Sequence, residues 1–402
     1  MLVKFHNGIA FKVRQLPYLF LLIIFLLTLG VEKLIADEAN DSYFVSNKYP
    51  VDVSFMIADL KYSEERGVKI CEIQHGILST FRGDRMVHGE PGHVFVNLNN
   101  HLSQFHEKSW AAFLQFSDPG IREQMAKSIN WSTHSSLGSI LKDKDFKKKS
   151  SMPVYDPNNI HSYHGFLTVK PTNILDYESF LKKYPGIILM GRATHPFWID
   201  KFKMTELFSQ DETLASFKPR WKLYKKKYTK TLAKEIIEDL QCDSFVIKPR
   251  GAFLGNGVII VDKDNLDDTL NYILNKSKEL FSDPDQSYSY WCFDPFDSLL
   301  VEEFIPSDPI SVPYFDNKVY QPTMRVGFLL IYNEHKVDIK FLVGYWLLPY
   351  YAINEGGTLN EKHKAYCKLP YFCEADPEVL SEVYRQLNIA LPLLYKQMLM
   401  KE

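Results

Sequence analysis

Two closely spaced apolar segments near the start of the chain constrain its fold most strongly. Residues 51–60 and 68–74 have the composition of strands, and the polar residues 63–67 between them end in glycine. From Val51 to Ile57, apolar side chains occupy alternate positions, which is the period of a strand with one buried face. We therefore predict that the two segments form a β-hairpin.

The spacing of apolar residues also predicts the later elements, with a period of two for strands and about 3.6 for helices. Strands are predicted over residues 186–190, 244–248, 258–261, 299–305, 324–332 and 337–348, the last two as an antiparallel hairpin, and helices over residues 173–184, 228–240, 264–280 and 378–398. The last helix is expected to be interrupted at Pro392, because proline lacks a backbone N–H. Strands and helices are segregated rather than strictly alternating, so an α+β fold is favoured over a Rossmann sheet. At 402 residues, the chain is long enough for two or three packed units.

The N-terminus has a different character. Basic residues precede a charge-free, largely apolar run from Leu16 to Val31, and charge returns at Glu32. Sixteen helical residues span roughly 24 Å, less than a hydrocarbon core of roughly 30 Å. With the small residue Ala36, this pattern is typical of a signal peptide or signal anchor in residues 1–36. The alternative, a buried core helix, is less favoured because the run has no polar face.

Charge and cysteine content exclude other classes. A net charge of −2 argues against a nucleic-acid binder that works by bulk electrostatics, so no nucleic-acid partner is predicted. The five cysteines are scattered and show no CxxC pair, so neither a zinc knuckle nor a disulfide framework is indicated.

A lysine and a glycine-rich segment form the first candidate site. The strand at 244–248 ends in Lys248, and a loop with Gly251, Gly255, Asn256 and Gly257 follows. Glycines let backbone N–H groups approach phosphate oxygens, and a lysine adds a point charge for the same anion. The spacing is neither that of a Walker A loop nor that of GxGxxG. Taken alone, the segment is equally consistent with a hairpin and a flexible turn.

Paired acids on a short apolar strand form the second candidate. Glu302 and Glu303 follow Leu299–Val301, and such a strand could present its backbone to a purine edge. The alternative is an edge strand with solvated glutamates.

The third candidate lies on the predicted hairpin. Glu72 and Gln74 point to the same face of their strand because side chains at i and i+2 do so, and Asp59 can join them across the hairpin. Oxygen donors of this kind suit Mg²⁺. The alternative, a solvated polar face, fits poorly with the apolar neighbours Ile70 and Ile73.

Together these segments resemble the motifs of ATP-grasp ligases. The similar stretches are Asp59 with Glu72-Ile-Gln74, Asp200-Lys201, Ile247-Lys248-Pro249 with the glycine loop, and Val301-Glu302-Glu303-Phe304-Ile305. The hairpin precedes the lysine segments, and this permuted order is similar to eukaryotic-type glutathione synthetase and to glutathionylspermidine synthetase. The resemblance covers roughly residues 51–83 and 195–350. It implies an ATP-grasp fold of the α+β class, with nucleotide held between two subdomains.

The resemblance also implies roles for individual residues. Lys201 and Lys248 would hold ATP phosphates, the loop from Gly251 to Gly257 would close over the γ-phosphate, and Arg325 would stabilise the transferred phosphate. The remaining roles are the adenine hinge for Glu302 or Glu303, the ribose hydroxyls for Asp308, substrate positioning for Ser79, and Mg²⁺ ligation for Asp59, Glu72 and Gln74.

Two departures from the family pattern concern the chemistry. Gln74 stands where the family has asparagine, which moves the carbonyl oxygen by one methylene. Ile57 stands where many relatives have an arginine that supports the reacting phosphate, and Lys61 is a candidate substitute.

The expected organisation follows from these assignments. The predicted regions are a leader at 1–36, a metal-site hairpin at 37–95, a substrate-binding region at 96–195, a lysine and glycine-loop subdomain at 196–298, and the hinge strand with the remaining core and C-terminal helix at 299–402.

The leading functional hypothesis is a carboxylate–amine ligase that uses ATP and Mg²⁺ and acts through an acyl phosphate. Its substrates would be small-molecule or peptide acids and amines. The alternatives are a phosphotransferase or non-catalytic nucleotide-binding protein of the same fold, and a membrane-tethered interaction protein. Residues 16–31 predict membrane association or secretion, which conflicts with the use of cytosolic ATP; a start site assigned too far upstream would make the protein cytoplasmic.

Overall fold

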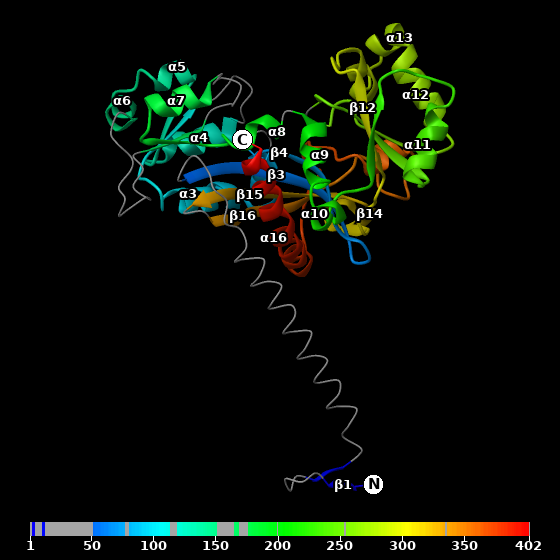
Figure 1. Ribbon diagram of the computed structural model, residues 1–402, viewed down its shortest axis with the longest axis horizontal. Coiled ribbons are helices and arrows are strands. Elements are labelled where there is room, and N and C mark those ends of the chain that lie inside the picture. The colour runs from blue at the N-terminus through cyan, green and yellow to red at the C-terminus, as the bar shows by residue number, and fades with distance from the viewer. Residues whose placement is uncertain are drawn as a thin grey trace. The chain divides into compact units, whose positions relative to one another are not determined.

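A computed structural model describes most of the chain (Figure 1). The described residues are 2–4, 10–12, 51–76, 80–112, 119–150, 165–168, 176–198, 200–252, 255–333 and 336–401. Residues 1–44 and 45–402 are two separate compact units. In the first, β1 (Leu2–Lys4) pairs with β2 (Ala10–Lys12). The predicted apolar leader, residues 16–31, lies outside the described residues. None of the helices in the described part of the chain has both the length and the hydropathy needed to traverse a bilayer.

An antiparallel sheet in the second unit contains the predicted N-terminal hairpin. Its order is β17-β16-β15-β3-β4, and its strands are β3 (Val51–Ser63), β4 (Gly67–His75), β15 (Thr323–Asn333), β16 (Lys336–Leu347) and β17 (Phe372–Glu374). Both predicted hairpins, β3–β4 and β15–β16, are confirmed. The pairing of β3 with β15 joins them, and Figure 1 shows these strands side by side. Helices α2 (Thr80–His88), α3 (His93–Leu102) and α16 (Pro377–Met400) pack on this sheet.

A second antiparallel sheet has the order β11-β10-β12-β9. Its strands are β9 (Trp221–Lys225), β10 (Ser244–Pro249), β11 (Ile259–Asp262) and β12 (Ser298–Glu303). Their apolar side chains share a core with α11 (Leu232–Leu240) and α12 (Leu266–Asn275), including Ile236, Ile247 and Leu270. The predicted strands and the helix at 228–240 are observed, the helix beginning at Leu232.

One helix prediction in this region is wrong. Residues 264–280 form two helices, α12 and α13 (Ser277–Phe281), instead of one. The break lies at Lys276, whose φ of −108° and ψ of 59° are not helical. The apolar spacing continues across the break, so periodicity alone did not reveal it.

Residues 109–189 contain a parallel sheet, which the predicted segregation of strands and helices did not anticipate. Its order is β6-β5-β7-β8, with strands β5 (Ser109–Ala112), β6 (Trp131–His134), β7 (Gly165–Thr168) and β8 (Ile187–Leu189). The helices between them are α4 (Pro119–Lys127), α5 (Leu137–Ile140), α6 (Lys144–Ser150) and α7 (Tyr177–Lys183). Trp110, Phe146 and Leu189 form its core. The prediction of segregated elements is therefore wrong for this region, because short strands with polar residues give little periodic signal.

The C-terminal helix corrects another prediction. Helix α16 runs without interruption through Pro392, although proline removes one helical hydrogen bond. Pro392 is buried, and so are its helix neighbours Leu391, Leu394 and Tyr395. Packing of this apolar face keeps the helix continuous where local propensity predicts a break.

The other described elements include two strands, β13 (Ile310–Val312) and β14 (Lys318–Tyr320), that pair with each other as a separate antiparallel sheet. They also include α8 (His195–Trp198), α9 (Lys201–Phe208), α10 (Glu212–Ser216), α14 (Gln286–Ser289), α15 (Leu359–His363) and the 3₁₀ turns η4 (Tyr290–Cys292) and η5 (Pro313–Phe315).

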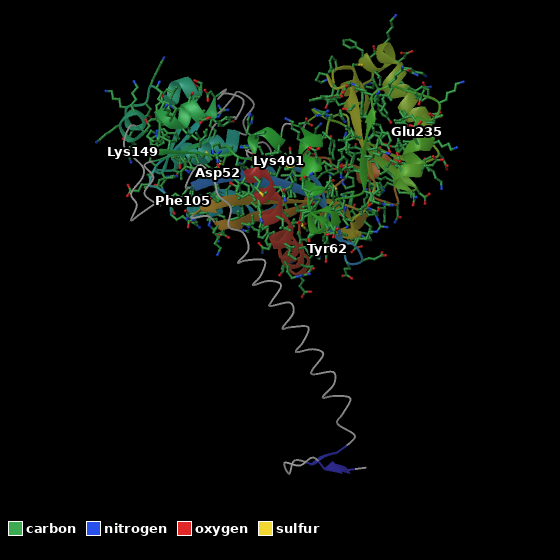
Figure 2. All side chains as sticks on the ribbon, viewed as in Figure 1. Asp52, Tyr62, Phe105, Lys149, Glu235 and Lys401 are labelled. Atoms are coloured by element: carbon green, nitrogen blue, oxygen red, sulfur yellow. The ribbon has the colours of Figure 1, made fainter. Side chains whose placement is uncertain are left out.

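A buried carboxylate ties three distant segments together. Asp52, labelled in Figure 2, lies on β3, and its Oδ1 is 3.2 Å from Nε of Arg192, which follows β8. The hydroxyl of Tyr395 on α16 donates to its Oδ2. These contacts join the parallel sheet, the antiparallel sheet and the C-terminal helix.

The buried His75 at the end of β4 makes stability depend on pH. Burial lowers the pKa of His75 from 6.5 to about 4, so between these values the unfolded chain binds a proton that the folded chain does not. Stability is therefore lost as pH falls through this window. We expect His75 to contribute a loss of about 2 kcal/mol between neutral pH and about pH 5. Urea unfolding of the wild type and of His75→Gln, each at neutral pH and at about pH 5, measures this loss of stability. An equal pH dependence in the two proteins would contradict the prediction.

Candidate functional site

A cleft between the two antiparallel sheets brings together residues that are far apart in sequence. The space between its lining side chains amounts to about 340 Å³, part of which is open to solvent. It is lined by β4, α9, β10, β12 and the segment before β9. The charged residues of its lining are Glu72, Lys201, Lys218, Lys248 and Glu302. Three lysines face two carboxylates, so the lining carries one positive charge in excess, which favours an anionic ligand.

Glu302 lies at the centre of a buried ion cluster. Lys248 on β10 and Glu302 on β12 reach the same face of their sheet, with Lys248 Nζ 2.5 Å from Oε2. Lys218 Nζ is 2.7 Å from the other carboxylate oxygen. Both ammonium groups also donate to the backbone carbonyl of Cys71 on β4, at 3.1 Å from Lys218 and 3.0 Å from Lys248. The cluster thus couples the two sheets.

The protonation of this cluster follows from opposing effects. Burial lowers the pKa of Lys218, and the Glu302 carboxylate only partly opposes the shift. Burial alone would lower the pKa of Lys248, but the attraction of the Glu302 carboxylate is stronger and raises this pKa. Burial would raise the pKa of Glu302, yet the two lysines lower it. Glu302 is therefore ionised at neutral pH, and its charge depends on both partners.

Lys201 begins α9 and contacts the early hairpin. Its ammonium group forms an ion pair with the carboxylate of Glu72 on β4. Asp200 caps the helix by accepting from Phe202 N at 3.0 Å, and its Oδ2 is 2.6 Å from Nη2 of Arg250. The backbone N–H of Lys201 donates to Arg250 O at 3.1 Å. The helix start is thus fixed to the first residue after β10, where the glycine-rich segment begins.

The predicted metal ligands lie on neighbouring strands. Asp59 is directly opposite Glu72 in the β3–β4 pair and opposite Arg325 in the β3–β15 pair. Arg325 binds both Asp59 oxygens, with Nε–Oδ1 and Nη2–Oδ2 distances of 2.7 Å each. Gln74 Nε2 donates to Asp59 Oδ2 at 3.3 Å.

A buried oxygen with no hydrogen-bond partner in the described part of the chain indicates that a cation fits beside Asp59 and Glu72. Gln74 is 2% exposed, and its Oε1 is buried without a hydrogen-bond partner among the described residues. An unpaired buried acceptor costs about 1–3 kcal/mol, so such an atom calls for a ligand. With the carboxylate oxygens of Asp59 and Glu72, it offers the oxygen donors that Mg²⁺ prefers. The donor set therefore fits this ion.

The glycine-rich segment is shaped by its backbone. Gly255 and Gly257 have φ values of 73° and 70°, a region that disfavours residues with a Cβ. Trp291 Nε1 donates to Gly257 O at 3.0 Å, and Tyr290 OH to Gly251 O at 3.2 Å, so 3₁₀ turn η4 supports both ends. Asn256 between the two glycines is half-buried. Residues 253–254 lie outside the described residues.

Two other predicted site residues, Glu303 and Asp308, are placed elsewhere. Glu303 points to the opposite face from Glu302 and binds Arg220, with a 2.8 Å distance from Nε to Oε2. Asp308 accepts from the backbone N–H of Glu64, at 2.8 Å, at the turn of the first hairpin. Neither residue lines the cleft. Ser79 lies outside the described residues.

Sequence reasoning missed Lys218. The tripeptide Lys-Pro-Arg occurs twice, at 218–220 and 248–250, and this duplication was the available signal. In both copies the lysine binds Glu302, while the arginines bind Glu303 and Asp200 respectively.

Lys61 is a further buried cation near Asp59. Its ammonium group donates to the backbone carbonyls of Pro322 at 3.0 Å and His363 at 3.3 Å. Burial lowers the pKa of Lys61 to about 8. The role of Lys61 as a substitute for the missing arginine stays a prediction.

Two solved structures are similar to this one. D-alanyl-alanine synthetase A from Vibrio cholerae O1 biovar eltor str. N16961 matches at 10% sequence identity and a TM-score of 0.33, over 70% of this chain and 80% of that chain. The D-alanine-D-alanine ligase from Coxiella burnetii matches at 10% identity and a TM-score of 0.25, over 59% of this chain and 68% of that chain. No protein-family model and no curated protein matches the chain. Both structural similarities are distant.

Proposed function

We propose that this chain is an ATP-grasp-type enzyme, with its metal-site hairpin permuted to the N-terminal side, that uses ATP and Mg²⁺ to join a carboxylate to an amine. One observation carries the proposal: Lys201, Lys218 and Lys248, from separate segments, line one cleft with Glu72 of the early hairpin. Such an arrangement suits a polyphosphate, whose charge needs several cations.

Within this proposal each residue has a role set by its position. Lys201 and Lys248 bind phosphate oxygens, exchanging part of their contact with Glu72 and Glu302 for the ligand. Glu72, Asp59 and Gln74 hold Mg²⁺ through their oxygens. Arg325, whose Nε and Nη2 bind Asp59 in the structure, is assigned the role of stabilising negative charge on the transferred group.

ATP supplies the phosphoryl group that activates the carboxylate for attack by the amine. The task of the chain is then to position the reactants and to neutralise their charge. We assign the role of covering the phosphates and excluding water to the glycine-rich segment, which follows Arg250 directly. We assign the substrate contacts to residues 96–195, which include the parallel sheet.

A thermal-shift measurement with MgATP tests nucleotide binding. Ligand at 100 times its Kd should stabilise the fold by about 2.7 kcal/mol, because it binds only the folded chain. Lys201→Met should largely remove the rise in melting temperature with MgATP. Lys203 is an exposed lysine on the same helix, so Lys203→Met should retain this rise. A wild-type protein that shows no shift with MgATP would refute the proposal.

A second candidate function is nucleotide binding without ligation. The two-point contact between Arg325 and Asp59 favours this second candidate. In this contact a predicted Mg²⁺ ligand, Asp59, is bound to a predicted phosphate-binding group, Arg325, so neither side chain is available for its catalytic role. Hydroxylamine trapping with MgATP and a panel of amino acids and peptides distinguishes the two. A hydroxamate product supports ligation, and nucleotide binding without hydroxamate supports the second candidate.

A further inference from the structure

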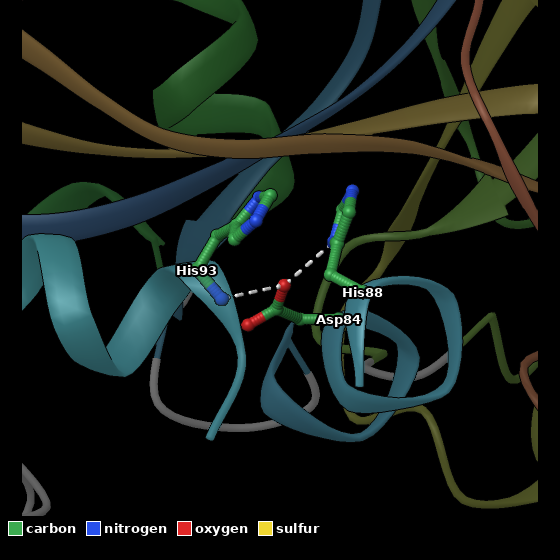
Figure 3. A group of neighbouring side chains, drawn as sticks. All are labelled: Asp84, His88 and His93. Atoms are coloured by element: carbon green, nitrogen blue, oxygen red, sulfur yellow. Dashed lines mark hydrogen bonds and ion pairs between the residues drawn. The ribbon is translucent and has the colours of Figure 1, made fainter. Parts of the chain in front are cut away.

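The connection between α2 and α3 brings a carboxylate and two imidazoles close together (Figure 3), and none of the three residues lines the cleft. Asp84 and His88 are four residues apart on α2, so they lie on the same face of the helix. Five residues after His88 the chain re-enters a helix at His93, the first residue of α3. Potential ligand atoms of the three side chains all lie within 4.8 Å of one another.

Asp84 is held rigidly at the centre of this group. It is fully buried, and its oxygens accept from the backbone N–H groups of His93 at 3.1 Å and Val94 at 2.8 Å. A Cβ at Gly92 would lie 2.4 Å from Asp84 Oδ2, and Gly92 has a φ of 85°, so this close approach requires glycine. The loop is thus built around the carboxylate.

Asp84 also determines which nitrogen of His88 is available. Its Oδ1 is 2.8 Å from His88 Nδ1, and an ionised carboxylate can only accept, so Nδ1 carries the hydrogen. Nε2 of His88 is then the atom with the free lone pair. A carboxylate that orients an imidazole in this way is the usual support of a metal-binding histidine.

His93 supplies a second imidazole beside the first. The two rings stack with their centroids 4.0 Å apart and their planes at 21°. The side chain of His88 is 12% exposed, whereas His93 is exposed, so the His93 ring can turn toward a shared ion without disturbing the core. Imidazole nitrogens favour first-row transition metals such as Zn²⁺ over Mg²⁺.

We propose that His88 and His93 bind a first-row transition metal ion such as Zn²⁺, with Asp84 as the residue that positions His88. Water completes the coordination. This site is independent of the nucleotide cleft and of the proposed ligase activity.

Titration of the chelator-treated full chain with ZnCl₂, followed by calorimetry, tests the proposal. We expect about one equivalent of Zn²⁺ per chain at this site. His93→Ala should weaken its affinity by more than about 100-fold, because loss of a ligand exceeds the 10–100-fold cost of losing an orienting partner. Asp84→Asn should weaken the Zn²⁺ affinity by only about 10–100-fold, because Asp84 orients a ligand and is not one itself.

Two controls keep the result interpretable. His101→Ala, on α3 but outside the group, should bind Zn²⁺ as the wild type does. Co²⁺ in place of Zn²⁺ should give a visible spectrum without thiolate charge-transfer bands, which separates this site from the free cysteines. Because His93 is exposed, its variant should fold, and unchanged Zn²⁺ affinity in folded His93→Ala would overturn the proposal. Thiolate bands in the Co²⁺ spectrum would overturn it as well.

Discussion

Replacing Lys248 with methionine is expected to reduce the turnover of MgATP by ~10²–10³-fold, the usual effect of removing one group that stabilises transition-state charge. Methionine retains most of the side-chain length and removes the charge. Lys218 still pairs with Glu302 in this variant, so the carboxylate is not left alone in the protein interior. The fold should therefore persist, and the loss should appear in ATP affinity and ADP release.

Lys225→Met is the matched control for this experiment. Lys225 lies on β9 of the same sheet but is exposed, and it does not line the cleft. ADP release should be measured with mixtures of acids and amines, and melting curves should confirm that both variants are folded. Undiminished ADP release by folded Lys248→Met would remove the main support for the proposed function.

Glu302→Gln is expected to lower the free energy of unfolding by about 3–5 kcal/mol, the cost of breaking a buried ion pair from one side. The change leaves Lys218 and Lys248 buried beside each other without the carboxylate that both contact. Urea unfolding, with ΔG extrapolated to water, measures the loss. Adding Lys248→Met should recover part of it, because one of the two repelling charges is then removed.

The neighbouring residue provides a stringent control. Glu303→Gln differs by one position, but Glu303 faces Arg220, whose side chain is 54% exposed. Exposed ion pairs contribute about 0–1 kcal/mol, so the loss should not exceed this amount. Equal destabilisation by Glu302→Gln and Glu303→Gln would show that the buried ion cluster does not stabilise the fold.

Local pattern was sufficient for most elements of the antiparallel sheets. Alternation predicted the β3–β4 hairpin, and β15–β16 and the strand ending at Lys248 were also found from their apolar residues. Failures occurred where distant packing overrode local preference, as at Pro392, or where a parallel strand was too short to show a period, as for β5 and β6. Strand periodicity depends on neighbours two positions away, which is why it can be seen in a single sequence.

The sequence by itself determined the types of residue available for an anion and a cation: lysines at 201 and 248, and oxygen donors at 59, 72 and 74. Only the tertiary structure decided their partners. It joined Arg325 to Asp59 across 266 positions, added Lys218 to Glu302, and turned Glu303 away from the cleft. Periodicity reports which face of an element is buried, whereas the partner of a buried charge is chosen by sheet order and strand register, which arise when separate segments pack together.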